Sequence, residues 1–176
     1  MAEHSTHSLK YEPAEGPVLV VGSKIYDGRP DWRLQYPTGI GLDMLPGDGV
    51  DLVHNLEDKT PENLLGHFGH IDCVSILEHT QRPWIVSENL QGMLRPGGSI
   101  YLTVPFIWRH HGYPFDYWRI THSALPVLFP QIEWKNVGYL TGGQFIEGPQ
   151  KKYGRQDGHK FLIKSEVVGF GVKKCD

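Results

Sequence analysis

The segment WRHHGYPFDYWRIT, residues 108–121, combines two adjacent histidines with an acid, two arginines and several aromatic rings. Such a mixture is too polar for a buried core and too aromatic for an ordinary loop. His110 and His111 are suited to accept a proton near neutral pH, and with Asp116 they are also ligand types for a metal ion. Aromatic faces are supplied by Tyr113, Tyr117 and Trp118. The segment is therefore a candidate metal site, catalytic pocket, stacking platform or lid.

The spacing within this segment favours some of these alternatives over others. Side chains of adjacent residues on an extended chain point to opposite sides, so His110 and His111 are poorly placed to bind one ion. We therefore expect no bound metal. Asp116 and Arg119 are spaced to form an ion pair that fixes the segment, and Thr121 is placed to cap a following helix. The segment is best interpreted as a loop beside a binding pocket.

A second candidate site lies near the N-terminus, where PVLVVG (17–22) and IGLDM (40–44) are short apolar runs. Asp43 follows Gly22 by about 20 residues, a spacing at which an acid accepts hydrogen bonds from both hydroxyls of a ribose. The alternative is a turn aspartate before LPGDG. The stretch GSKIYDG lacks the G-x-G-x-x-G pattern that binds a pyrophosphate, which argues against a dinucleotide. A nucleoside without a pyrophosphate, such as an adenosine sulfonium, does not need that loop.

Apolar runs and their boundaries predict the elements that position these residues. Strands are expected at 17–22, 40–44, 50–56, 71–77, 99–105, 132–140 and 161–172. Helices are expected at 60–69, at 83–94 and, in a short form, at 121–129. Strands that alternate with helices predict an α/β fold with a largely parallel sheet. Ligands bind beyond the carboxyl ends of the strands in such a sheet.

Composition limits the class of protein. A chain of 176 residues is expected to form a tail at 1–16 and a single domain at 17–176. Its net charge of −3 disfavours a general nucleic-acid binder, and the basic stretch at 151–160 is interpreted as a solvated loop. The two cysteines lack metal-site spacing, and no signal peptide or membrane-length segment is evident. We therefore expect a cytoplasmic protein without a membrane partner.

Five stretches, taken in order, resemble the class I S-adenosylmethionine-dependent methyltransferases, and in particular small type-11-like domains. They are VLVVGS, GIGLDM, DCVSILEHT, LQGMLRPGGSIYLTVP and HGYPFDYWRIT, between about residues 18 and 129. The resemblance implies a Rossmann-like, doubly wound, mostly parallel seven-stranded sheet with a reversed C-terminal hairpin. It also implies S-adenosyl-L-methionine as the cofactor.

The resemblance assigns roles on the cofactor side. Gly22 and Ser23 would form the loop under the methionine part, Asp43 would hold the ribose hydroxyls, and Met44 would lie beside the adenine. Further cofactor contacts are implied at two positions in the adenine pocket and two under the sulfonium, namely Asn55, Leu56, Ile76 and Leu77.

The acceptor side follows the fourth and fifth strands. The implied proton acceptors are His79, His110 and His111, and the implied acceptor-binding residues are Glu78, Tyr113, Asp116, Tyr117 and Arg119. The chain departs from the family in its first loop, where Val20 replaces the usual acid and Lys24 and Tyr26 replace later glycines. Lys24 would need Asp27 or the cofactor carboxylate as a partner for its charge.

The predicted function is methyl transfer from S-adenosylmethionine to an oxygen or nitrogen of a small or medium-sized acceptor: a sugar, a metabolite or a nucleoside. The altered first loop favours an alternative, a methyltransferase-like module that binds or regulates without catalysis. A nucleic-acid methyltransferase is a third hypothesis, disfavoured by the net charge. Because little chain precedes the first strand, we expect an acceptor site that is open or is completed by a second copy or a partner protein.

Overall fold

A computed structural model describes residues 9–26, 28–112, 115–141, 144–147 and 165–175. Its strands are β1 (Val18–Val21), β2 (Gly39–Asp43), β3 (Leu52–Val53), β4 (Phe68–Val74), β5 (Leu94–Pro105), β6 (Ile132–Thr141), β7 (Gln144–Glu147) and β8 (Glu166–Lys173). The α-helices are α1 (Pro83–Met93) and α2 (Leu125–Leu128). Short 3-10 turns are η1 (Trp32–Gln35), η2 (Glu62–Leu64), η3 (Leu77–His79) and η4 (His122–Ala124).

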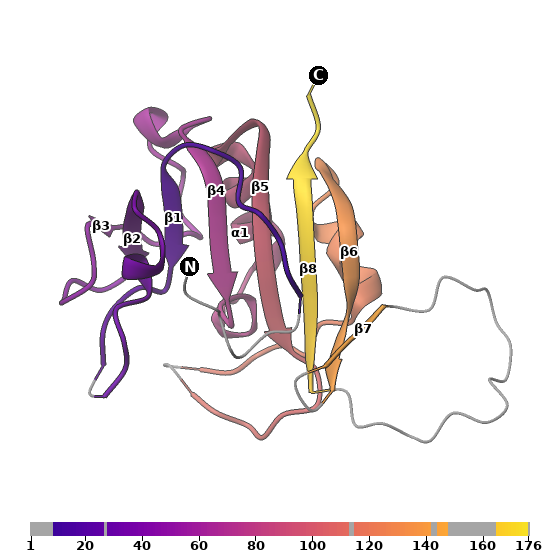
Figure 1. The fold of residues 1–176 in the computed structure, drawn as a ribbon. Helices are drawn as coiled ribbons and strands as arrows, with labels where there is room; N and C mark the ends of the chain where they lie inside the picture. The colour runs from indigo at the N-terminus through magenta and orange to yellow at the C-terminus, as the bar shows by residue number, and fades with distance from the viewer. Residues whose placement is uncertain (1–8, 27, 113–114, 142–143, 148–164, 176) are drawn as a thin grey trace, which may run out of the picture.

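The described strands form one sheet in the order β3-β2-β1-β4-β5-β8-β6-β7 (Figure 1). Strands β1 to β5 pair in parallel, whereas β8 lies antiparallel between β5 and β6. Without β7, these strands form the predicted seven-stranded sheet with its reversed C-terminal hairpin. The short β7 is an added edge strand that pairs with β6. It lies between the strands expected at 132–140 and 161–172, where no element was expected.

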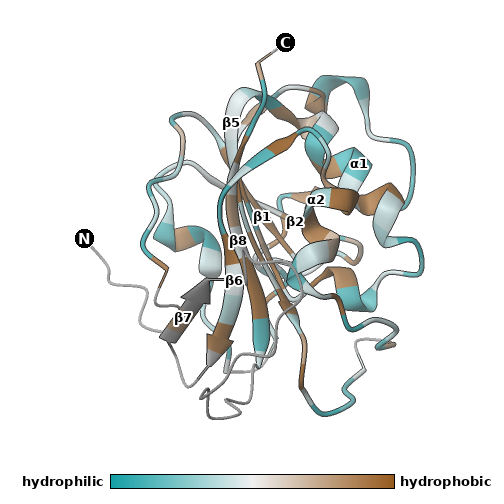
Figure 2. Ribbon diagram, turned by 90° about the vertical axis from the view of Figure 1, so that its right-hand side faces the viewer, coloured by the Kyte–Doolittle hydropathy of each residue, from teal (hydrophilic) through white to brown (hydrophobic). Residues whose placement is uncertain are grey.

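Alternating strand residues enter two apolar layers on opposite faces of the sheet. Leu19 and Val21 pack in the larger layer with Val86 and Leu90 of α1, which are fully buried. Figure 2 shows α1 and α2 together on this side of the sheet. Burial of this one face is the main source of stability, because the free energy gained grows with the apolar area removed from water.

Residues 9–17 cover part of the other face, where Figure 1 shows the N-terminal chain crossing in front of the sheet. The ring of Tyr11 stacks on that of Tyr101, with 4.6 Å between ring centroids. The Tyr11 hydroxyl lies 3.1 Å from that of Tyr36, which donates to Asp72 Oδ2 at 2.9 Å. The second half of the predicted tail therefore packs on the sheet, while residues 1–8 lie outside the described residues.

Three predicted elements differ in the structure. The helix expected at 60–69 is only the turn η2, because Gly66 adopts a φ of +62° and Phe68 already belongs to β4. The strand expected at 50–56 shortens to Leu52–Val53, since Asn55 Oδ1 accepts from Glu57 N and turns the chain. The helix after residue 121 forms, but without a hydrogen bond from the Thr121 side chain.

Candidate active site

The carboxyl ends of β1 and β2 are joined by backbone hydrogen bonds. Gly22 N and Ser23 N both donate to Leu42 O, at 2.8 and 3.2 Å. Gly22 has a φ of +70°, and a Cβ at this position would collide with Cδ1 of Ile76. Only glycine combines this backbone conformation with so close an approach. The turn after β1 therefore lies directly against the loop after β4.

Asp43 ties the end of β2 to the first loop. Its Oδ2 accepts a hydrogen bond from Lys24 N at 3.3 Å, and its Oδ1 accepts one from Leu45 N at 3.0 Å. Asp43 therefore stabilises the turn after β2, which is the alternative considered from the sequence. Each carboxylate oxygen has a second lone pair, however, so these bonds do not exhaust the acceptors of Asp43. Met44 and Leu45, both about half exposed, place apolar surface next to this acid.

Lys24 and its neighbour Ile25 pack against the loop after β2. Ile25 N donates to Asp48 O at 2.8 Å, and the Lys24 stem lies against Gly47. The Lys24 ammonium lies 5.7 Å from the centre of the Tyr26 ring, within range of a cation–π interaction. Asp27, the partner considered for Lys24, lies outside the described residues. The Ser23 hydroxyl is buried and has no hydrogen-bond partner among the described residues.

The four other predicted cofactor contacts divide into exposed and buried positions. Asn55 is exposed at the end of the third strand, and Ile76 is half-buried beneath Gly22. Leu56 belongs to the core, and Leu77 has no exposed surface at all. The structure therefore gives Leu77 a packing role: a ligand above β4 would meet Ile76 rather than Leu77.

Glu78 lies in a cluster with His79 and His111, three residues that the sequence analysis assigned to the acceptor side. Its side chain is fully buried, and neither carboxylate oxygen accepts a hydrogen bond from a described residue. Burial, with a smaller contribution from the negative charge of Asp116, raises the pKa of Glu78 to about 8. The Glu78 carbonyl accepts from Tyr117 N at 2.7 Å, which draws the segment after β5 over this residue.

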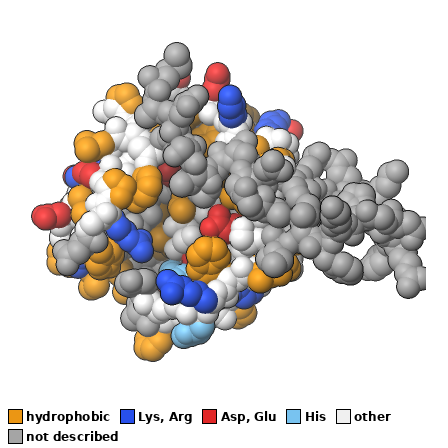
Figure 3. Space-filling model, turned by 60° about the horizontal axis from the view of Figure 1, so that its bottom comes forward, with side chains coloured by type: hydrophobic (Ala, Val, Ile, Leu, Met, Phe, Trp, Pro, Cys, Tyr) orange, Lys and Arg blue, Asp and Glu red, His pale blue; other side chains and the backbone are white. Residues whose placement is uncertain are grey.

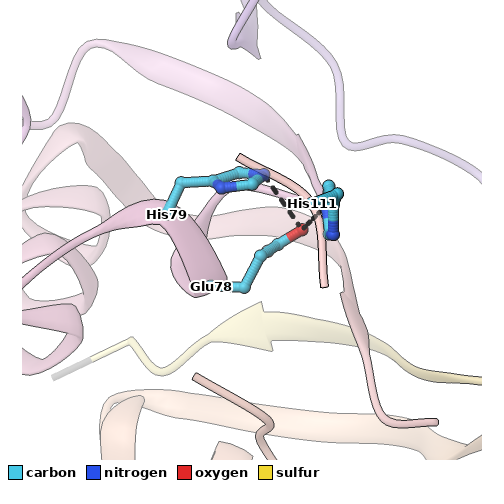
Figure 4. A group of neighbouring side chains, drawn as sticks. All are labelled: Glu78, His79 and His111. Atoms are coloured by element: carbon cyan, nitrogen blue, oxygen red, sulfur yellow. Dashed lines mark ion pairs between the residues drawn. The ribbon is translucent and has the colours of Figure 1, made fainter. Parts of the chain in front are cut away.

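Two histidines converge on Glu78 from different parts of the chain (Figure 4). His79 Nε2 lies 3.6 Å from Glu78 Oε1, and His111 Nε2 lies 3.9 Å from the same oxygen. His79 Nδ1 is 2.6 Å from the carbonyl of Phe115, and His111 Nδ1 is 3.1 Å from Asp116 Oδ2. A carbonyl and a carboxylate can only accept, so both Nδ1 atoms donate. In a neutral imidazole the Nε2 atom is then the acceptor.

The ion pair predicted between Asp116 and Arg119 forms and fixes the segment after β5. Arg119 Nη2 donates to Asp116 Oδ2 at 2.8 Å, and the guanidinium also reaches the carbonyls of Trp108 and Arg109. Asp116 Oδ2 accepts from His111 N at 2.8 Å as well. These donors, Arg119 first, hold the pKa of Asp116 far below its usual range. The ion pair thus positions His111 indirectly.

The remaining predicted acceptor-side residues do not join this cluster. His110 is exposed, and Tyr113 lies outside the described residues. Tyr117 is 44 % exposed, and its hydroxyl accepts from Gln81 Nε2 at 3.4 Å. Viewed from below, this end of the molecule shows charged groups of both signs and a histidine among apolar side chains (Figure 3).

Comparison with known proteins supports the topology. No family model matches the sequence, and no curated protein matches it. The structure is similar to Burkholderia thailandensis 1,6-didemethyltoxoflavin-N1-methyltransferase, with a TM-score of 0.60 and 12 % identity over 91 % of this chain and 72 % of that one. The chain has the class I S-adenosylmethionine-dependent methyltransferase fold.

Two further structures share this methyltransferase fold. One is a mutant form of the 16S rRNA (adenine(1408)-N(1))-methyltransferase of Catenulisporales acidiphilia, with a TM-score of 0.56 and 15 % identity over 93 % of this chain and 90 % of that one. Another is a chain from the complex of the Haloferax volcanii Trm112 methyltransferase activator with an inferred methyltransferase. That match has a TM-score of 0.58 and 14 % identity over 99 % of this chain and 88 % of that one.

The sequence named Glu78, His79 and His111 as candidates on the acceptor side, but it did not indicate that they form one group. His110 and His111 were expected to point to opposite sides, and the structure places His111, not His110, beside Glu78 and His79. The signal for Glu78 was its position directly after the fourth strand. Its contact with His111 depends on how the segment after β5 folds back, which spacing alone does not reveal.

The described part of the methyltransferase fold contains no helix that is long and apolar enough to cross a membrane.

Proposed function

We propose that this chain is an S-adenosylmethionine-dependent methyltransferase that acts on an oxygen or nitrogen atom of a small or medium-sized acceptor. The observation that carries the proposal is the position of Asp43. It ends β2, is hydrogen-bonded to the first loop, and lies at the same carboxyl edge of the sheet as the cluster of Glu78, His79 and His111. The proposed reaction uses a carboxylate that binds the ribose of the cofactor and a base that removes a proton from the acceptor.

The residues at the ends of β1 and β2 fit the cofactor. Asp43 retains acceptor capacity for the two ribose hydroxyls, and the exposed Met44 offers an apolar surface to a flat base. The buried hydroxyl of Ser23, which has no hydrogen-bond partner among the described residues, is available to a polar group in the first loop. Lys24 lies in the same loop and could pair with the cofactor carboxylate. When bound, the cofactor supplies an electrophilic methyl group on a sulfonium.

The acceptor side has the means to remove a proton. His79 and His111 each present an Nε2 lone pair, and each is oriented through its Nδ1 proton. An imidazole that accepts a proton becomes a cation. Glu78, in its ionised form, would stabilise that charge from the adjacent position. Methyl transfer is an in-line displacement. Alignment of the acceptor atom with the methyl group of the cofactor therefore supplies much of the rate enhancement. Tyr117 and Trp118 provide exposed rings at the rim.

A small acceptor is favoured over a nucleic acid because the net charge is −3 and a phosphate backbone would need a basic surface. The rRNA methyltransferase among the similar structures shares the fold at 15 % identity, and this likeness does not extend to the acceptor. The basic stretch at 151–160 lies outside the described residues. We retain an open acceptor site, completed by a second copy or a partner protein, as a prediction.

A turnover assay tests this proposal. The protein is incubated with S-adenosylmethionine and a panel of sugars, nucleosides, phenols and amines, and released S-adenosylhomocysteine is quantified. Turnover on any member is expected to fall about 100-fold or more in His79→Ala and His111→Ala. Val127→Ala, an exposed position on α2, serves as the matched control and should retain activity. Cofactor binding without turnover on any acceptor would instead support a catalytically silent binding module.

A further inference from the structure

Glu78, His79 and His111 form a group whose composition matches a metal site. One ligand atom from each lies within 4.8 Å of the others, and the three residues come from η3 and from the segment after β5. Two imidazole nitrogens and one carboxylate oxygen are a recurrent ligand set for divalent transition metals such as Zn²⁺. No metal was expected from the sequence, where the ligand set considered was His110, His111 and Asp116 and adjacent histidines point to opposite sides.

The outer nitrogens of both histidines are already held. The carbonyl of Phe115 accepts from His79 Nδ1, and the carboxylate of Asp116 faces His111 Nδ1. Metal-binding histidines almost always donate the other ring N–H to a carbonyl or a carboxylate, which fixes the ring and increases its basicity. Both rings therefore have the support that histidine ligands require, and the Nε2 atom of each is joined to Glu78 Oε1 by a dashed line in Figure 4.

With Glu78 ionised and both rings neutral, the inner atoms of the cluster are all electron-pair donors. Two nitrogen lone pairs face a carboxylate oxygen at 3.6 and 3.9 Å, distances at which the three groups repel one another. The Glu78 side chain is fully buried, and neither of its oxygens accepts a hydrogen bond from a described residue. A single cation between the three atoms could accept an electron pair from each of them, including the Glu78 oxygen that accepts no hydrogen bond from a described residue.

The distances are close to those of a bound ion. Tetrahedral Zn²⁺ with bonds of about 2.0–2.1 Å separates neighbouring ligand atoms by roughly 3.3 Å. The observed separations from Glu78 Oε1 exceed this by a few tenths of an ångström. The three ligand atoms lie within 4.8 Å of one another, so rotation of the His79 and His111 side chains would have to bring them closer around the ion.

We propose that Glu78, His79 and His111 bind one divalent transition-metal ion, Zn²⁺ in the first instance, with a fourth position open to an acceptor oxygen. The role of this ion rests on the proposed function, whereas its binding does not. An ion at this position would lower the pKa of an acceptor hydroxyl. With the ion bound, His79 and His111 are ligands and not bases, so the hydroxyl would release its proton to solvent. Its oxygen would form the bond to the methyl carbon, and the carbon–sulfur bond would break with its electron pair left on sulfur.

Metal titration of the chelator-treated protein tests the site directly. We expect one Zn²⁺ per chain with micromolar or tighter affinity by calorimetry, and a visible absorption band when Co²⁺ is used as the probe. His79→Ala, His111→Ala and Glu78→Gln should each weaken binding at least 100-fold. Asp116→Asn, which removes no ligand but changes the partner of His111 Nδ1 and of Arg119, should weaken it about 10- to 100-fold. His67→Ala, an exposed histidine outside the cluster, is the matched control and should bind like the wild type.

Equal metal affinity in the wild type and the three ligand variants would overturn the proposal, as would the absence of binding in the wild type. Thermal melting of each variant checks that the fold is retained. Titration with S-adenosylhomocysteine, performed on the same metal-free protein, separates this inference from the proposed function. If the cofactor product binds and the metal does not, the metal site is refuted while the methyltransferase proposal stands.

Discussion

His79 and His111 meet edge to face with 4.8 Å between ring centroids, although one lies in η3 and the other follows β5. The contact exists because the segment after β5 folds back and donates two backbone N–H groups to the Glu78 carbonyl. Two loops at the carboxyl edge of the sheet thereby act as one unit. A disturbance of either loop should reach both imidazoles.

The Asp116–Arg119 ion pair should affect turnover more than cofactor affinity. Asp116→Ala removes the acceptor that holds His111 and deprives Arg119 of this carboxylate. We expect kcat to fall about 10- to 100-fold, since misplacement of about 1 Å near a reacting group can cost that much. The dissociation constant of S-adenosylhomocysteine should stay within about twofold, because Asp43 is untouched. Loss of cofactor affinity in step with kcat would instead indicate a general structural role.

In the metal-free protein, Glu78 should make the folded state less stable than glutamine at the same position would. Its carboxyl is buried and accepts no hydrogen bond from a described residue, and such a group costs free energy that a neutral amide would reduce. Glu78→Gln also supplies N–H donors to the lone pairs of His79 and His111. The variant should therefore unfold at a higher temperature than the wild type after chelator treatment. An unchanged or lower midpoint would show that Glu78 is already satisfied.

His70 should make stability depend on pH in acid. Burial lowers the pKa of His70 from 6.5 to about 4 in the folded protein. The unfolded chain therefore binds a proton between these values that the folded protein does not, and stability falls as pH decreases from 6.5 toward 4. The loss attributable to His70 is about 3 kcal/mol at the acid end. Denaturant unfolding across this range, compared with His70→Asn, isolates the contribution, and equal slopes in both proteins would contradict it.

Gly22 should be required for backbone and packing reasons that can be separated. Gly22→Ala forces a left-handed conformation on alanine and drives its Cβ into Ile76 Cδ1. We expect a loss of about 1–3 kcal/mol in unfolding free energy. Adding Ile76→Val removes the colliding methyl group and should restore part of that loss but not all. Full recovery in the double variant would mean that the backbone conformation contributes nothing.

Much of the fold was predictable because strand residues here are apolar in short, bounded runs. VLVVG and SIYLTVP identified β1 and the end of β5, and helical spacing with RPGG identified α1. The 60–69 stretch misled because its start resembles a helix N-terminus, whereas its end contributes to β4. Phe68 and His70 are fully buried there, so sheet pairing prevailed over the local helix signal.

Candidate residues at the ends of strands could be named from the sequence, whereas contacts between residues of different loops could not. Asp43 became a candidate through its distance to Gly22 and its strand, and Glu78 through its position after the fourth strand. The approach of His111 to Glu78 depends on the Asp116–Arg119 pair and on backbone hydrogen bonds to the Glu78 carbonyl. The network of Tyr36 and Asp72 on the opposite face depends likewise on how the η1 segment packs, which no local pattern revealed.

The central claim is that the ends of β1 and β2 bind an adenosine sulfonium, and calorimetry with S-adenosylhomocysteine tests it most directly. The wild type should bind one equivalent with micromolar affinity, and Asp43→Ala should lose that binding while it retains the wild-type melting curve within a few degrees. Val127→Ala provides the matched control, since this exposed residue lies on α2. Absence of heat from the wild type at millimolar ligand would contradict the account, as would undiminished binding to Asp43→Ala.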